Sequence, residues 1–223
     1  TKKVNMNLAI HHRAGSFSDR WVAYCEEQGI PFKLVDCFAT DIIEQLDGVD
    51  ALMWHWSLGD YQCLVFAKGL VQSIEQMGVR IFPNSHTCWH YDDKVSQKYL
   101  FEALGLPMIP SYTFYRQQDA LAWVNQTTYP KVFKLRGGAG SVNVRLVENR
   151  RVAQHLVCQA FGRGFPAFSR KAVLDDKVRV FTKKKDFRSL LDVVFCFARF
   201  IFPSKRERTS PRDQGYVYFQ DFI

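Results

Sequence analysis

The sequence predicts an α/β protein in two parts, a parallel-sheet domain over residues 1–84 and an α+β domain over residues 85–223. The first third of the chain alternates short apolar runs with helical patterns, and residues 129–147 have the pattern of strand, glycine-rich turn and strand. In addition, 47% of the 223 residues are hydrophobic. That share is enough to build a core, which argues against a disordered chain.

Four strands and two helices are expected in the first domain. The strands are expected over residues 4–10, 31–35, 51–54 and 79–82. One helix is expected over residues 16–28, closed by Gly29. Another is expected over residues 60–77, where apolar residues recur at helical spacing at Leu64, Ala67, Val71, Ile74 and Met77. Strands that alternate with helices predict a parallel sheet with helices on both faces.

The second domain begins with an expected helix over residues 92–104. The residues of this helix that are expected to be buried are Val95, Tyr99, Leu100, Ala103 and Leu104. Residues 106–110 are expected to be extended, because each proline disfavours a helical residue before it. Strands are expected over 111–115, 129–135 and 142–147, and helices over 118–125 and 149–161. The glycine-rich turn at 136–141 between two strands predicts an antiparallel hairpin.

Residues 162–214 form an unusual segment, for which we expect a strand over 178–182 and a helix over 186–202. That helix carries one narrow polar stripe, made of Arg188, Asp192, Cys196 and Arg199. Its other positions are apolar, and basic runs flank it within the segment 183–208. The pattern favours docking of 186–202 on a missing C-terminal domain or on a second subunit of a homo-oligomer. An anionic membrane surface remains the alternative. A last strand is expected over 216–223.

The net charge is +8, which is compatible with phosphate, nucleic acid or anionic lipid as a partner, or with ordinary solvated loops. Nucleic acid is not expected, because the aromatic residues follow core-like spacing and are not interleaved with the basic ones. Six cysteines without a CxxC pair indicate reduced thiols, and no signal peptide is visible. We therefore expect a cytoplasmic protein.

Polar clusters follow two strands of the first domain. His11, His12 and Arg13 follow the first strand, and residues 55–57, beginning with His55, follow the third. Ligands of parallel sheets bind beyond the carboxyl ends of the strands. His11, His12, Arg13 and His55 are therefore candidate substrate residues, and the alternative is that these are ordinary exposed loops.

A lysine and a glycine-rich loop carry the clearest chemistry. Lys134 lies near the end of a strand, and Arg136 and the sequence Gly-Gly-Ala-Gly-Ser at 137–141 follow it. The backbone N–H groups of such a loop can close on phosphate oxygens, while the two cations neutralise their charge. A plain tight turn is the alternative. The loop matches neither the P-loop nor the GxGxxG pattern.

A metal site in this chain is not expected. His86 and His90 are spaced by four residues with Cys88 between them. Spacing supplies no third ligand, and a bound metal needs three or four.

The order of several short motifs resembles the ATP-grasp superfamily. These are Pro83-Asn84, Asp93-Lys94, the run 104–110, and Tyr129-Pro130 followed by Lys134 and its glycine loop. The branch that contains glutathione synthetase and the ribosomal-protein-modification glutamate ligases is the most similar. The resemblance covers residues 83–147 and, more modestly, 216–223. It implies that residues 1–84 are a pre-ATP-grasp domain and that 85–223 contain the lid subdomain and the hinge strand.

The resemblance also implies roles for single residues. Lys94 and Lys134 would be the two phosphate-binding lysines. Gln220 stands where the family usually has a Glu that faces the adenine amino group, and Asp221 and Ile223 would offer a backbone C=O and N–H to the adenine edge. The flexible loop over the phosphates would be Gly137, Gly138, Ala139, Gly140 and Ser141.

The function implied is an ATP-dependent carboxylate–amine ligase that works through an acyl-phosphate. The family's Mg²⁺-binding carboxylates follow the hinge strand, whereas this sequence ends at Ile223. We therefore expect ATP binding without turnover, with Mg²⁺ needed only by the full-length protein. The alternatives are a non-catalytic nucleotide-sensing or protein-interaction module and a peripheral membrane protein that uses residues 183–208.

Overall fold

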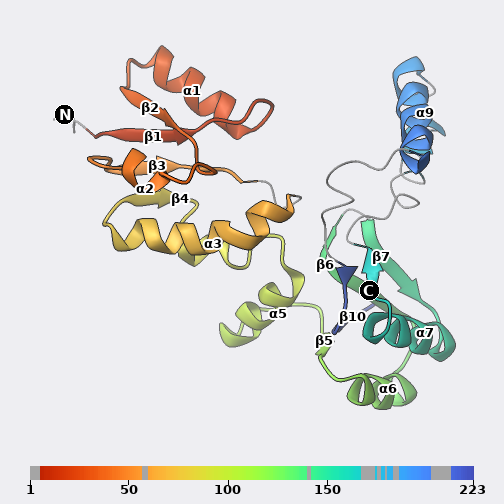
Figure 1. The fold of residues 1–223 in the computed structure, drawn as a ribbon. Helices are drawn as coiled ribbons and strands as arrows, with labels where there is room; N and C mark the ends of the chain where they lie inside the picture. The colour runs from red at the N-terminus through yellow and green to blue at the C-terminus, as the bar shows by residue number, and fades with distance from the viewer. Residues whose placement is uncertain are drawn as a thin grey trace. The chain divides into compact units, whose positions relative to one another are not determined.

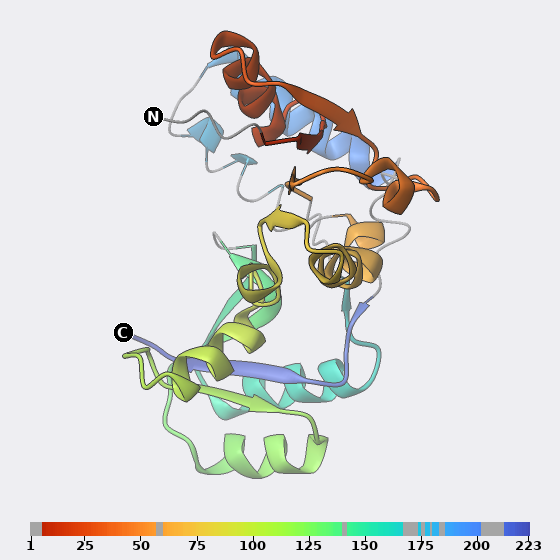
Figure 2. The same cartoon turned by 90° about the vertical axis from the view of Figure 1, so that its left-hand side faces the viewer.

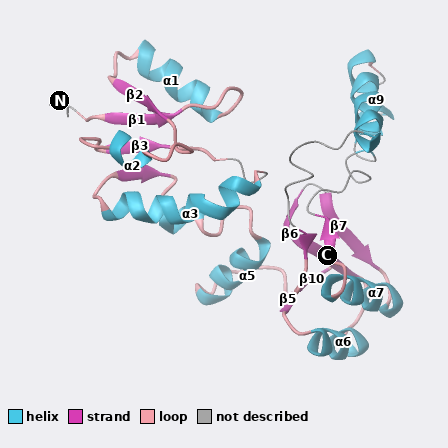
Figure 3. Cartoon of the chain, in the orientation of Figure 1, coloured by secondary structure: helices cyan, strands magenta, loops and turns pink. Residues whose placement is uncertain are grey.

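The computed structural model describes residues 6–56, 60–139, 142–166, 174, 177, 178, 180–182, 186–201 and 212–223. The chain divides into two compact units, residues 1–91 and residues 92–223 (Figure 1). Figure 3 shows that both units combine helices with a sheet. The α/β fold class predicted from the sequence is confirmed.

Unit 1 is a four-stranded parallel sheet of order β2-β1-β3-β4. Its strands are β1 (Leu8–His11), β2 (Phe32–Val35), β3 (Ala51–Met53) and β4 (Arg80–Phe82). Its helices are α1 (Phe17–Glu27), α2 (Ile42–Gln45), α3 (Tyr61–Gln76) and α4 (Ser85–Cys88). Cys88 of α4 belongs to the core of this unit, so residues 85–91 lie with the first sheet.

Both faces of the unit 1 sheet are covered, as predicted. Leu8 and Ile10 pack with Cys25 of α1 on one face. Ala9, between them in sequence, belongs to the cluster on the other face, which includes Ala67 and three further buried residues of α3. This alternation follows from the two-residue period of a strand. Figure 1 shows α1 and α3 on opposite sides of the sheet.

Local signals set the ends of the long helices in unit 1. The Ser16 side chain accepts from the Ser18 N–H at the start of α1, and Asp60 accepts from the Gln62 N–H at the start of α3. Gly29 and Gly78 follow the two helices with positive φ angles of 60° and 82°. These starts and stops confirm the predicted helices.

Unit 2 is built on an antiparallel sheet of order β5-β10-β6-β7. Its strands are β5 (Ser111–Phe114), β6 (Lys131–Ala139), β7 (Val142–Val147) and β10 (Val217–Asp221), and β8 (Phe165–Pro166) pairs separately with β9 (Arg212–Asp213). Its helices include α5 (Lys94–Ala103), α6 (Gln117–Gln126), α7 (Arg150–Phe161) and α9 (Phe187–Ile201). The β6–β7 pairing confirms the predicted hairpin. Figure 2 shows the blue β10 alongside the green β5.

The two faces of this sheet differ in chemistry. Phe133, Val217 and Phe219 belong to the cluster that also holds Ala120 of α6 and Leu156 of α7. Because side chains alternate along a strand, Lys134, Tyr218 and Gln220 lie on the opposite face. The helix-covered face is the core, and the other face is available for polar chemistry.

Three predictions about unit 2 need correction. The strand expected over 178–182 is wrong, since residues 177, 178 and 180–182 are helical. Lys177 there pairs with Asp192 of α9 at 2.8 Å, so tertiary context overrides the β-branched local sequence. The β6 strand also continues to Ala139, beyond the turn predicted at 136, with a shift in register after Lys134.

The third correction concerns α5. Tyr99, Ala103 and Leu104 were expected inside but are exposed. Lys98 is only 9% exposed, since its ammonium pairs with Glu102 at 2.6 Å while its aliphatic stem packs. The side of α5 that packs therefore carries Val95 and Lys98.

None of the six cysteines, all of which lie in the described part of the chain, forms a disulfide, and five of them are buried. Among the residues that the structure describes, no helix is both long enough and apolar enough to cross a bilayer.

Candidate functional site

Lys134 and Gln220 meet on the open face of the unit 2 sheet. The Lys134 ammonium donates to Gln220 Oε1 at 2.5 Å. The Gln220 amide nitrogen donates to Ser111 Oγ at 3.0 Å, and the Tyr218 hydroxyl donates to the same oxygen at 2.8 Å. Ser111 in turn donates to the carbonyl of Ile109 at 2.9 Å. Every polar atom of this row is satisfied, so the amide oxygen of Gln220 is held toward Lys134.

Lys94, the second predicted lysine, is the first residue of α5. Its ammonium lies 3.2 Å from Gln97 Oε1 and 3.9 Å from the Asp92 carboxylate. The pKa of Lys134 is lowered from its usual value, mainly by burial and further by the positive charge of Lys94. The structure therefore brings the two predicted lysines within electrostatic range of each other. Two ammonium groups that repel each other in this way favour an anion between them.

Asp93 fixes the start of α5 beside this site. One carboxylate oxygen accepts from the N–H groups of Val95 and Ser96, both at 3.1 Å. The other lies 2.9 Å from the guanidinium of Arg136 on β6. Asp93 is 7% exposed whereas the Arg136 side chain is 52% exposed, so the helix cap is shielded from water and the ion pair only in part. Asp93 thus ties the helix that begins with Lys94 to the strand that carries Lys134.

Arg136 is held from its backbone as well. Its N–H donates to the Tyr216 hydroxyl oxygen at 2.7 Å, and that hydroxyl donates to Asp213 Oδ1 at 2.9 Å. Burial raises the pKa of both Tyr216 and Asp213 above their ordinary values. The guanidinium of Arg136, predicted to contact phosphate, is thus paired with Asp93, and its phosphate contact stays a prediction.

The glycine-rich loop is described as far as Ala139. A Cβ added at Gly137 would meet nothing within 4 Å, so packing within the protein does not require glycine there. Close approach of a ligand to the backbone would be a reason for it. Gly138 and Ala139 belong to the last part of β6, and Gly140 and Ser141 lie outside the described residues.

Asp221 is the last residue of β10, and Ile223 follows two residues later. The Asp221 carboxylate pairs with Lys131 at 2.6 Å, and its backbone N–H donates to the Pro110 carbonyl at 2.9 Å. Lys131 lies 6.0 Å from the ring centroid of Trp123 on α6, which places this pair on the helix-covered face. Ile223 is 89% exposed. The carboxylate of Asp221 therefore points away from Lys134, and its predicted adenine contact would involve only its backbone.

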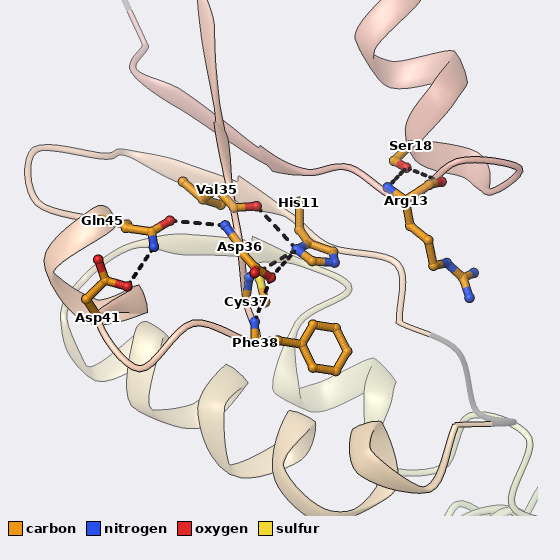
Figure 4. A network of polar contacts seen from close by, with 9 residues as sticks. All are labelled: His11, Arg13, Ser18, Val35, Asp36, Cys37, Phe38, Asp41 and Gln45. Carbon is orange, nitrogen blue, oxygen red and sulfur yellow. Dashed lines mark hydrogen bonds and ion pairs between the residues drawn. The ribbon is translucent and has the colours of Figure 1, made fainter. Parts of the chain in front are cut away.

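A separate polar edge occurs in unit 1, where His11 is buried at the end of β1 (Figure 4). The Cys37 N–H lies 3.0 Å from His11 Nδ1, and the Val35 carbonyl lies 3.2 Å from it. Because an N–H can only donate, Nδ1 of neutral His11 acts as the acceptor and its proton lies on Nε2. Burial lowers the pKa of His11, which favours this neutral form.

Arg13 and His55 lie near His11 at the same edge. The charge of Arg13 lowers the pKa of both imidazoles, after the larger effect of burial. Nδ1 of His55 is buried and has no hydrogen-bond partner among the described residues, and the Phe17 ring stands edge-on to this imidazole at 4.7 Å. His12 instead turns to Asp19, 2.8 Å away. His11, Arg13 and His55 thus lie at or just after the carboxyl ends of the neighbouring strands β1 and β3, and their contact with a substrate stays a prediction.

Sequence reasoning gave no role to Ser111, Tyr216 or Tyr218. A usable signal existed for Tyr218, since it lies two residues before Gln220 and therefore on the same face of the strand. Ser111 and Tyr216 reach the site through partners far away in sequence, and local patterns do not reveal such pairs.

No protein-family model matches the chain, and no curated protein matches its sequence. Solved structures do match. An ATP-grasp RimK domain protein from Sphaerobacter thermophilus superposes with a TM-score of 0.53 at 12% identity, over 97% of this chain and 64% of that one. The biotin carboxylase domain of the Hydrogenobacter thermophilus 2-oxoglutarate carboxylase gives 0.53 at 14% identity, over 97% and 44%.

The chain has the ATP-grasp fold. A biotin carboxylase from Campylobacter jejuni, solved as a complex with an ATP analogue, matches with a TM-score of 0.51 at 15% identity, over 97% of this chain and 45% of that one. The resemblance inferred from short motifs is thereby confirmed at the level of the fold. The chain spans less than two thirds of the length of each of these three ATP-grasp structures.

Proposed function

We propose that this chain binds ATP on the open face of the unit 2 sheet, as part of an ATP-dependent carboxylate–amine ligase. The observation that carries the proposal is the Asp93–Arg136 pair, which ties the start of α5 with Lys94 to the strand that carries Lys134. An anion would relieve the repulsion between the two lysines that this arrangement produces. ATP-grasp structures that superpose on the chain were solved with nucleotide, one of them with MgADP. The common fold and the paired cations support the same ligand.

The residues present fit a nucleotide. Lys94 and Lys134 would neutralise phosphate charge, and the backbone around Gly137 has room for close approach. Gln220 Oε1 has two lone pairs, so it can accept from an adenine amino group while it accepts from Lys134. Ser111 holds the Gln220 amide in the required orientation.

For the whole protein we propose acyl-phosphate chemistry, in which a carboxylate is activated and then joined to an amine. The chain's contribution to such a transfer is positioning and charge neutralisation. Within the described residues, no three His, Cys, Asp or Glu side chains are placed to hold a metal ion, so we assign Mg²⁺ to no residue here. We expect residues 1–223 alone to bind ATP without releasing ADP.

We also propose that the unit 1 edge binds an anionic group of a substrate. Arg13 supplies an exposed guanidinium, and the neutral imidazoles of His11 and His55 lie beside it. A guanidinium with adjacent hydrogen-bonding rings suits a carboxylate. The identity of the acid and of the amine is not part of the proposal.

Calorimetric titration with ATP tests the nucleotide site. Lys134→Ala should lower the affinity by about tenfold or more, because a hydrogen bond to a charged group contributes about 1.5–3 kcal/mol. Lys33→Ala is the matched control, since it removes the same charge from an exposed lysine in unit 1. If the folded whole protein fails to bind millimolar ATP, the proposal is refuted. Binding without ADP release by the whole protein would favour a nucleotide-sensing module over a ligase.

A further inference from the structure

Among its described side chains, helix α9 exposes large apolar ones and buries the small Ser189 and Cys196. Phe187 is 74% exposed, Phe195 66% and Val194 56%. By contrast, Ser189 is 6% exposed and Cys196 is 8% exposed. A helix on the surface of a protein in water normally has the opposite arrangement. The exposed apolar side of α9 therefore needs a partner that is not water.

Two polar residues of α9, Asp192 and Ser189, have partners within the chain. Asp192 pairs with Lys177 at 2.8 Å. The Ser189 N–H donates to the Asp186 carboxylate at 2.6 Å, and the Ser189 hydroxyl donates to the Asp186 carbonyl at 3.0 Å. The exposed side is continuous on a helical projection, because its residues recur at spacings of three and four: Phe187, Leu190, Leu191, Val194 and Phe195. What remains unsatisfied on α9 is thus an apolar surface.

The charge of the surrounding sequence identifies the partner. Residues 183–208 contain eight basic and three acidic side chains, the largest local share of a net charge of +8. Lys183, Lys184 and Lys185 precede α9 by two to four residues, and Arg188 is exposed on its first turn. Two copies of this chain would bring like charges together if they met through α9. An anionic surface with an apolar layer beneath it satisfies both the charge and the apolar side.

We propose that α9 binds the surface of an anionic membrane, lying in the plane of the headgroups with its apolar side chains in the acyl boundary. The helix has 15 residues, fewer than the roughly 20 needed to span a bilayer, so it would lie on the membrane and not cross it. Arg188 would remain at the level of the lipid phosphates. This interaction is independent of the proposed ATP site.

Vesicle co-sedimentation of the whole 223-residue chain tests the proposal. The probe is phosphatidylcholine vesicles with about one third phosphatidylserine, compared with vesicles of phosphatidylcholine alone. The chain should bind the anionic vesicles several-fold more tightly. Val194→Asp should weaken that binding by about tenfold or more, since it places a charge in the buried apolar side. Val65→Asp on α3 is the matched control, because Val65 is 67% exposed on another helix and its substitution should leave vesicle binding unchanged.

Three outcomes would overturn the proposal. The first is no binding to anionic vesicles by the folded chain. The second is equal binding by Val194→Asp and the unsubstituted chain, which would mean adsorption by charge alone. The third is a dimer in sedimentation velocity that Val194→Asp dissociates, which would make a second copy the occupant of α9. Circular dichroism of both variants shows whether each is folded before its binding is compared.

Discussion

The repulsion between Lys94 and Lys134 predicts how nucleotide affinity depends on pH. In the free protein, burial and the Lys94 charge lower the pKa of Lys134. Bound phosphate would favour the ammonium form and raise that pKa again. The bound state then holds more protons than the free state, so affinity is highest at low pH and falls as pH rises through the free-state pKa of Lys134.

Lys94→Met separates the two causes of the lowered Lys134 pKa, which are burial and the charge of Lys94. The substitution removes one phosphate contact, which should lower the ATP affinity about tenfold near neutral pH. This loss lies at the lower end of the range of about 1.5–3 kcal/mol for hydrogen bonds to charged groups, because Lys94 is partly exposed. The substitution also removes the repulsion on Lys134, so the decline of affinity begins at higher pH. The ratio of the ATP affinity of the unsubstituted chain to that of Lys94→Met should therefore fall toward one as pH rises.

Calorimetry with ATP should run from about pH 7.5, above the last protonation of a phosphate monoester near pH 6, to about pH 10.5, the ordinary pKa of a lysine. Lys134→Met is the control, because it removes the group whose titration is invoked and should flatten the profile. A profile in Lys134→Met that matches that of the unsubstituted chain would refute the reasoning. So would a constant affinity ratio between the unsubstituted chain and Lys94→Met across the range.

Three further predictions concern the stability of unit 2. Asp93→Ala should lower the free energy of unfolding by about 2 kcal/mol, from a helix cap and the half-exposed pair with Arg136, whereas Asp60→Ala should lose only a cap of about 1 kcal/mol. Urea denaturation compares the two, and equal losses would count against the ion pair. Asp213→Asn should raise the free energy of unfolding at neutral pH but not near pH 3. Burial raises the pKa of Asp213 in the folded state, so above the unfolded-state pKa of about 3.9 its ionisation favours the unfolded chain. A variant less stable at both pH values would contradict this sign. Phe219→Ala should cost about 3–5 kcal/mol, since the ring is fully buried, and a loss below about 1 kcal/mol in thermal melts would show that the core is misassigned.

The sequence predicted those elements whose signals are local. Asp60 and Gly78 mark the ends of α3 in the sequence and also in the structure, because a cap and a positive φ depend only on nearby residues. Helices α2 and α4 were missed, since four residues are too few to show a period. On α5, Tyr99 was expected inside but is exposed, whereas Lys98 is buried because Glu102 one turn later neutralises it.

The site was predicted only in part for a similar reason. Lys134 and its glycine loop form one local motif, and Lys94 was assigned through the resemblance to a family. The groups that position these lysines come from distant segments. Arg136 meets Asp93 across more than 40 residues, and Gln220 meets Ser111 across 109. No short pattern encodes such a pair, because either partner alone is an ordinary surface residue.

The place of β10 in the unit 2 sheet has a consequence for biosynthesis. This strand lies between β5 and β6, yet Lys131 and its partner Asp221 are 90 residues apart in sequence. While a ribosome is still making the chain, β5 and β6 each present an unpaired backbone edge toward the gap that β10 later fills. Such edges pair readily with other chains, and contacts this distant in sequence form slowly. The nascent second unit is therefore expected to depend on chaperones until residues 217–221 have left the exit tunnel.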